Sequence, residues 1–196
     1  MAQIRKIHFS VLVLLLAGCG WRSIPQAKNA VEASLAEITN QYKRRADLIP
    51  NLVKVVKGYA QHEQETLQAV VEARSKASQA TIDPTKLDAE KLQDFQRAQG
   101  SLSSALGRLM VIVEKYPDLK ADRNFRELQA QLEGTENRIA VARQRYIEAI
   151  KNFNNLVTVP PESWTNSLFY SFEKLPQWSV DEGEKKQIEN APKVEF

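Results

Sequence analysis

The sequence contains few residues of the kinds that disulfides, metal sites and nucleophilic active sites use. Its 196 residues include one cysteine, Cys19, and two histidines, His8 and His62. A lone cysteine has no internal disulfide partner, and the neighbours of His62 give no standard metal-ligand spacing. There is no glycine-rich phosphate loop either. We therefore predict no metal, no cofactor and a non-enzymatic protein, with acid/base chemistry by the abundant carboxylates as the alternative.

A strong net charge is also missing once the N-terminus is set aside. The chain has 27 basic residues against 24 acidic ones, and two of the basic residues, Arg5 and Lys6, precede Cys19. The remainder therefore carries 25 basic residues against 24 acidic ones. The one compact basic cluster, Lys43-Arg44-Arg45, is diluted by Asp47 and by apolar neighbours. Because nucleic-acid binding uses a concentrated basic face, we expect no nucleic-acid partner.

The N-terminus carries the pattern of a secretory signal. Arg5 and Lys6 precede an apolar run from Ile7 to Ala17, and no acidic residue comes before Cys19. At roughly a dozen residues the run is too short for a membrane-spanning helix, which needs about 20. It ends in Leu16-Ala17-Gly18-Cys19, which resembles the bacterial lipobox. We predict a lipoprotein signal peptide over residues 1–18 and a lipid of the palmitate type on Cys19, with an uncleaved anchor as the alternative.

A lipidated cysteine would hold the protein at a membrane, on the side away from the cytoplasm. Two or more acyl chains make such anchoring stable. Gly20 follows the cysteine, and the sorting rule of enteric bacteria, which keeps Asp-bearing lipoproteins at the inner membrane, then favours the outer membrane. The cell membrane is the alternative. Residues 19–24 form a tether of at most about 20 Å at about 3.3 Å per residue, so Trp21 and Arg22 should lie among lipid headgroups.

Apolar residues recur in helical steps of three and four from Pro25 to about Ala80. Pro50 interrupts this stripe without changing its phase, and a proline inside a helix removes one backbone hydrogen bond. We predict one long helix kinked at Pro50, with two helices as the alternative. The stripe comprises Val31, Leu35, Ile38, Tyr42, Ile49, Leu52, Val56, Tyr59, Leu67 and Val70.

Two further stripes follow. Asp83-Pro84 predicts the start of a second helix, and Tyr116-Pro117-Asp118 its end. Asp122 should cap a third helix, which Pro160-Pro161 ends. No strand alternation competes with these helices. We therefore predict an all-α fold over residues 25–159: an elongated antiparallel bundle of three long helices with coiled-coil-like packing.

Residues 160–196 differ from the bundle. Trp164, Phe169, Tyr170, Phe172 and Trp178 crowd a short stretch, and a polar tail follows from Asp181. We predict a short C-terminal helix or an irregular tail. The aromatic residues either cover one end of the bundle or form a docking surface for a partner.

Three segments in order resemble the LemA family. The first runs from Gln41 to Val53 and includes Lys43-Arg44-Arg45-Ala46-Asp47, with Gly58-Tyr59-Ala60 and His62-Glu63 after it. The second is Tyr116-Pro117-Asp118-Leu119-Lys120-Ala121, and the third is Thr135-Glu136-Asn137-Arg138-Ile139-Ala140 with Ala142-Arg143 and Tyr146. The resemblance implies a helical, membrane-attached bacterial protein of undefined biochemical activity. The lipobox and the aromatic segment from Trp164 depart from the family pattern.

The charged residues of these segments carry a structural hypothesis. Arg45 lies three residues after Tyr42 and four before Ile49, on the buried side of the first helix, and Glu136 has the corresponding place on the third. We predict that Arg44 or Arg45 pairs with Glu136 and that Asp47 meets Arg138 or Arg143, which would fix helix register. Solvated surface charges are the alternative.

These patterns leave two non-enzymatic functions. A long apolar stripe suits a structural protein that assembles into homo-oligomers, since uncovered stripe residues need a partner chain. The aromatic segment suits an accessory protein that docks another envelope protein.

Overall fold

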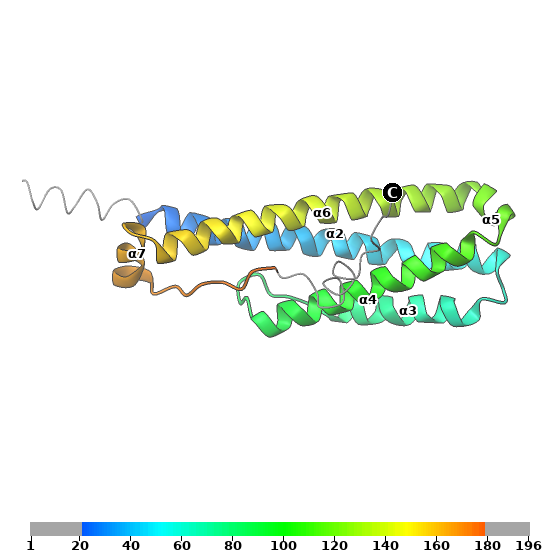
Figure 1. Ribbon diagram of the computed structural model, residues 1–196, viewed down its shortest axis with the longest axis horizontal. Coiled ribbons are helices and arrows are strands. Elements are labelled where there is room, and N and C mark those ends of the chain that lie inside the picture. The colour runs from blue at the N-terminus through cyan, green and yellow to red at the C-terminus, as the bar shows by residue number, and fades with distance from the viewer. Residues whose placement is uncertain (1–20, 179–196) are drawn as a thin grey trace, which may run out of the picture.

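The computed structural model describes residues 21–178, which form an elongated helical bundle (Figure 1). Its longest elements are α2 (Ser23–Tyr59), α4 (Ala89–Val113) and α6 (Arg123–Thr158), and α3 (Gln64–Gln79) is shorter. The remaining elements are α5 (Pro117–Ala121), α7 (Glu162–Thr165) and the π-helical turn η1 (Asn166–Tyr170). No described residue lies in a strand, so the all-α prediction is confirmed. The predicted signal peptide, Cys19 and the polar tail lie outside the described residues.

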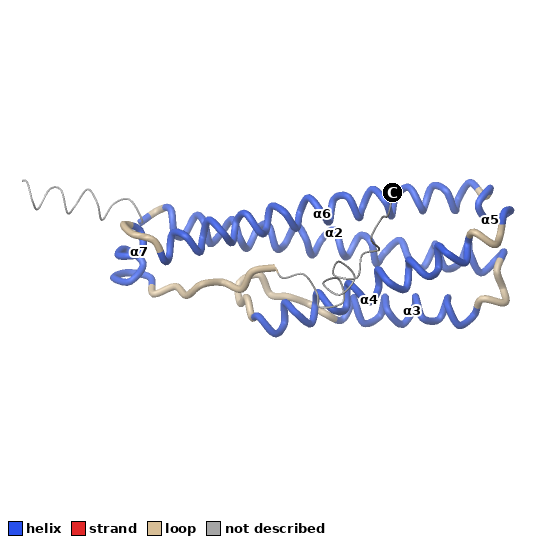
Figure 2. Tube along the Cα trace, in the orientation of Figure 1, coloured by secondary structure: helices blue, strands red, loops and turns tan. Residues whose placement is uncertain are grey.

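The helices pair unequally. α2 and α6 run antiparallel along the full length of the bundle, whereas α3 and α4 form a second antiparallel pair that covers only the half next to α5 (Figure 1). Over the other half, the loop 80–88 and the extended segment 171–178 take the place of helices (Figure 2). No helix among the described residues combines the length and the apolar character that crossing a membrane requires.

The unequal pairing gives the bundle two hydrophobic cores. The first core joins the N-terminal half of α2 to the C-terminal half of α6 and includes Tyr42, Phe95 and Tyr146. The second joins the C-terminal half of α2 to α3, α4, α5 and the start of α6, and includes Ile49, Leu102 and Phe125. The predicted stripes supply most residues of both cores.

The prediction of one helix up to about Ala80 is wrong, because α2 ends at Tyr59 and the chain turns before α3 begins at Gln64. The turn has no signature in the hydrophobic spacing. Val56, Ala60, Leu67 and Val70 all face the second core from the two antiparallel helices, so their steps stay in phase across the turn. Gly58, in the last turn of α2, is the one local signal of a helix end.

Pro50 lies inside α2, and the helix continues through it. A proline has no backbone N–H, so the carbonyl four residues earlier loses its usual donor. That carbonyl belongs to the buried Ala46, and Nε of Arg74 on α3 donates a hydrogen bond to it over 2.8 Å. A side chain of the neighbouring helix thus satisfies the acceptor that Pro50 leaves without a backbone partner.

Replacing Arg74 with alanine should lower the free energy of unfolding by about 1–2 kcal/mol, because the buried Ala46 carbonyl loses its donor. With Pro50→Ala as well, the backbone N–H of residue 50 can bond to that carbonyl, so the cost of Arg74→Ala should fall below about 0.5 kcal/mol. Urea denaturation of the four members of this double-mutant cycle measures the coupling. An equal cost in both backgrounds would show that Arg74 acts elsewhere.

The helix caps follow the sequence in one case and depart from it in another. The Asp122 side chain accepts a hydrogen bond from the Phe125 N–H over 2.8 Å at the start of α6, which confirms the predicted cap. α6 ends at Thr158, directly before Val159 and Pro160. The predicted start at Asp83-Pro84 is wrong: Asp83 accepts hydrogen bonds within a turn from the Thr85 N–H and hydroxyl, and Asp88 caps α4 five residues later.

The aromatic-rich segment divides into two parts. α7 and η1 fold across the end of the bundle at which α2 begins (Figure 1). Residues 171–178, which we call the strap, then run back along the first core in an extended conformation, and Phe172, Leu175 and Trp178 pack against it. A short C-terminal helix and an irregular segment are therefore both present.

Two buried asparagines hold the strap through its backbone. The Asn154 amide of α6 donates to the Leu175 carbonyl over 3.1 Å and accepts from the Leu175 N–H over 2.9 Å. Asn166 makes the same pair of bonds with Phe172, at 2.9 and 3.0 Å. Each amide thus satisfies the backbone N–H and carbonyl of one residue, as a neighbouring strand would.

Candidate functional site

The most connected polar residue in the described part of the chain is Arg45. It lies on α2 between the core residues Tyr42 and Ile49, so its side chain points into the bundle. The residue is only 2% exposed. A buried guanidinium is costly unless its charge and its N–H groups are matched.

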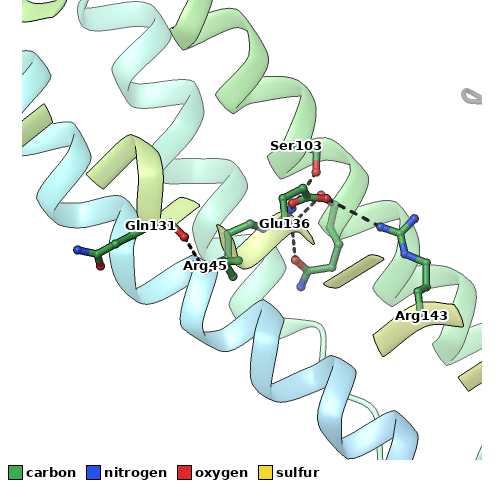
Figure 3. Close-up of polar contacts among 7 residues, drawn as sticks. Arg45, Ser103, Gln131, Glu136 and Arg143 are labelled. Atoms are coloured by element: carbon green, nitrogen blue, oxygen red, sulfur yellow. Dashed lines mark hydrogen bonds and ion pairs between the residues drawn. The ribbon is translucent and has the colours of Figure 1, made fainter. Parts of the chain in front are cut away.

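Arg45 obtains its partners from two other helices (Figure 3). Nη1 donates to Oε2 of Glu136 on α6 and to Oγ of Ser103 on α4, both over 2.9 Å. Nη2 donates to Oε1 and to the backbone carbonyl of Gln99 on α4, over 2.9 and 3.2 Å. Gln99 in turn donates to the Ala77 carbonyl of α3 over 3.1 Å. We call Arg45, Gln99, Ser103 and Glu136 the arginine node; through it all four main helices are linked.

The arginine node lies where the two hydrophobic cores meet. Tyr42, one turn before Arg45, belongs to the first core, and Ile49, one turn after it, belongs to the second. The guanidinium carbon also lies 4.9 Å from the centre of the Tyr42 ring, a cation–π distance. An arginine at this position therefore separates two apolar regions while bonding to the helices on both sides.

The charges of the node are unevenly exposed. The Glu136 side chain is 50% exposed and also lies 3.9 Å from Nη2 of Arg143, so it balances two guanidinium groups from the rim of the bundle. Burial raises the pKa of Tyr42 above its ordinary value of about 10, and the charges of Arg143 and Arg45 partly offset that increase. The Tyr42 hydroxyl is therefore protonated and uncharged at neutral pH.

The structure brings together only some of the predicted ion-pair residues. Arg45 and Glu136 lie in contact, and Arg143 joins Glu136. The prediction that Asp47 meets Arg138 or Arg143 is wrong, because Asp47 is exposed and forms no ion pair with any described residue. Arg44 and Arg138 are likewise exposed and are not paired with described residues. Positions 44 and 47 are three residues apart and share the helix face opposite the buried one, so their charges point to solvent.

Sequence reasoning missed the α4 residues of the node. Gln99 lies four residues after Phe95 and three before Leu102, on the same buried stripe. A polar side chain at a stripe position is the signal that could have identified it, since buried amides require partners. Ser103, at an adjacent position, carries no comparable signal.

A cleft of about 400 Å³ opens beside the node between α4 and α6. Leu106, Met110 and Leu132 give it apolar walls, and Arg45, Ser103 and Glu136 form its polar end. Gly107 also lines it, and a Cβ atom at this position would meet no atom within 4 Å. The cleft exists because α4 packs mainly on α3, and α6 mainly on α2. Among residues 21–178 no cluster of three metal-ligating side chains occurs.

Comparison with known proteins identifies the family. The sequence profile of the LemA family matches residues 34–196. The chain belongs to the LemA family. That match includes the aromatic-rich segment, so the expectation that the segment from Trp164 departs from the family is corrected. Membership of the LemA family points to an envelope-associated protein rather than to a known class of enzyme.

Individual relatives agree with this assignment. The chain is 26% identical to Protein LemA of Metamycoplasma hominis over 194 residues, covering 95% of this chain and 82% of that protein. It is also 36% identical over 64 residues to Magnetosome protein MamQ 2 of Paramagnetospirillum magneticum, which is 33% of this chain and 24% of that protein. A similar short match, at 34% identity, involves Magnetosome protein MamQ of Magnetospirillum gryphiswaldense.

The segments that resemble the LemA family meet at two places in the fold. Arg45 from the first segment and Glu136 and Arg143 from the third meet at the arginine node. Near the α5 end, the Tyr116 hydroxyl of the second segment donates to Glu63 over 3.0 Å. Residues of all three LemA-like segments thus form contacts between separate parts of the bundle.

Proposed function

We propose that this LemA-family protein is a lipid-anchored, non-enzymatic envelope protein whose bundle serves as a protein-interaction module. The observation that carries the proposal is the position of α2 relative to the predicted lipid site. α2 begins at Ser23, four residues after Cys19, and extends over 37 residues. At about 1.5 Å per residue it reaches about 55 Å, so the α5 end would stand well away from the lipid.

The use of the buried polar groups supports a role without catalysis. Both Nη groups of Arg45 donate hydrogen bonds to other helices. The buried side-chain amides of Asn154 and Asn166 bond to the strap backbone. His62 is exposed at the turn between α2 and α3. These residues stabilise the bundle, and the cleft beside Arg45 and Glu136 is open rather than enclosed.

The apolar stripes of α2 and α6 are covered by other parts of the chain, which favours binding of a different protein over self-assembly through these stripes. α3, α4, the loop 80–88 and the strap cover the faces of α2 and α6 that a coiled-coil homo-oligomer would use. The α4–α6 cleft stays open, with apolar walls and a charged end. We therefore propose another envelope protein as the partner of the cleft, with homo-oligomerisation as the alternative.

Cys19→Ala should abolish lipid attachment and release the processed protein from membranes. The wild type should be recovered in the membrane fraction with a lipid-sized increment in intact mass, because each buried methylene contributes about 0.8 kcal/mol to anchoring. Both properties should be lost in the variant, and Ser23→Ala serves as the matched control. An unprocessed chain that stays on membranes in both forms would refute the lipid anchor.

The released Cys19→Ala protein also separates the two modes of interaction. Sedimentation at micromolar concentration should give a monomer if the cleft receives a different protein. A stable oligomer would instead support assembly of the LemA chain with itself.

A further inference from the structure

We propose that the end of the bundle formed by Trp21, Trp164, Leu168 and Phe169 inserts into the headgroup region of a phospholipid bilayer. We call these four side chains the aromatic end. The proposal rests on the lipid anchor proposed above and adds a second, protein-made contact with the membrane. It would make the bundle stand upright on the bilayer rather than swing on its tether.

The four side chains are exposed in a protein whose other large apolar groups are mostly covered. Their exposed fractions are 52% for Trp21, 59% for Trp164, 76% for Leu168 and 55% for Phe169. They come from two segments that are distant in sequence, the start of α2 and the α7–η1 turn, which lie together at one end of the bundle (Figure 2). Exposed apolar groups gathered in this way mark a surface that meets an apolar partner.

The aromatic end is held rigidly. The Trp21 ring meets the Phe169 ring edge-on, with centroids 4.9 Å apart, and the Tyr170 hydroxyl donates to the Trp21 carbonyl over 2.7 Å. Ser171 closes η1 in a left-handed conformation, with φ 54°, and its N–H bonds to the Asn166 carbonyl over 2.7 Å. The turn therefore fixes Asn166 inward while Leu168 and Phe169 face solvent.

A bilayer fits this surface better than a protein partner because the predicted lipid-bearing residue, Cys19, lies next to it in the sequence. Trp21 is two residues from Cys19, so at about 3.5 Å per residue the backbone that would carry the predicted lipid lies within about 7 Å of it. The bilayer that takes up this lipid would therefore lie next to the aromatic end. Tryptophan and tyrosine are also the residues enriched where membrane meets water, since their rings are apolar and their N–H or O–H groups are polar.

The charges near the aromatic end are mixed. Arg22 and Lys174 are exposed, and so is Glu173. Insertion should therefore depend on the apolar side chains and only weakly on anionic lipid, in contrast to the strong anionic-lipid dependence of a polybasic membrane site.

Tryptophan fluorescence can test this contact on the full-length, processed protein reconstituted into phosphatidylcholine vesicles. The chain has three tryptophans, and Trp178→Phe removes the one that lies on the strap. Brominated phosphatidylcholine should then quench the emission of Trp21 and Trp164, and bromines near the headgroup should quench more than bromines near the chain ends. The unsubstituted protein is measured in parallel, so that any effect of Trp178→Phe on folding is seen as a difference between the two proteins.

The deciding variant is Leu168→Ser with Phe169→Ser, which should remove the Trp164 part of the quenching while the protein still floats with the vesicles through its lipid, because only Trp21 is then held near the bilayer by the tether. Val111→Ser, at an exposed apolar position on α4, should leave the quenching unchanged. Flotation without quenching in the wild type overturns the proposal, as does quenching that the double variant leaves intact. Loss of flotation in the wild type would count against the lipid anchor itself, so the two failures are distinguishable.

Discussion

Replacing Arg45 with alanine is expected to lower the free energy of unfolding by about 3 kcal/mol, among the largest effects of any single polar substitution in this protein. The change removes hydrogen bonds to Glu136, Ser103 and Gln99 and leaves a cavity where two cores meet. Guanidinium chloride denaturation followed by circular dichroism measures it. Arg44→Ala is the matched control. The Arg44 side chain is exposed, so its removal should change the free energy of unfolding by no more than about 0.5 kcal/mol.

Glu136 helps to separate the contribution of the node from that of a simple ion pair. Glu136→Gln should cost only about 1 kcal/mol, since its side chain is half exposed and Arg45 keeps its bonds to α4. Exchanging the two charges should not restore stability, because a glutamate at position 45 would face the Gln99 carbonyl instead of donating to it. Equal losses for Arg45→Ala and Glu136→Gln would mean that the ion pair alone carries the effect.

Asn154→Ala is expected to release the strap and to cost about 2–3 kcal/mol, because both polar groups of Leu175 lose their partner while remaining near the core. Trp178, which packs edge-on against Tyr146 with centroids 5.9 Å apart, should become accessible to acrylamide. Asn155→Ala is the control, since that neighbouring asparagine is exposed. Unchanged acrylamide quenching in Asn154→Ala would show that side-chain packing alone holds the strap.

The sequence could predict α6 almost completely, and the reasons are local. An aspartate cap, an unbroken apolar stripe and a pair of prolines each mark a feature with one physical meaning. The turn after Tyr59 could not be predicted in the same way, because hydrophobic periodicity records which face is buried and not whether the chain has reversed. Two antiparallel helices on one core can keep the same phase as one straight helix.

The arginine node was only partly predictable for a related reason. The position of Arg45 on the buried stripe of the first helix indicated that it needed a partner, and the stripe of the third helix gave Glu136 the corresponding place. The contributions of Gln99 and the Ala77 carbonyl depend on how α3 and α4 pack, which is a tertiary property. The hydrogen bonds from Asn154 and Asn166 to the strap are also a tertiary property. Nothing near these two residues in sequence shows that an extended segment returns to them.

The different lengths of the helix pairs have a consequence for how the molecule can open. α2 and α6 belong to both cores, whereas the α3–α4 hairpin closes mainly one half and the strap closes the other. Each closing element can detach alone, as a cooperative unit smaller than the domain. A binding partner that displaced the strap could therefore expose one half to hydrogen exchange while the other half kept its protection.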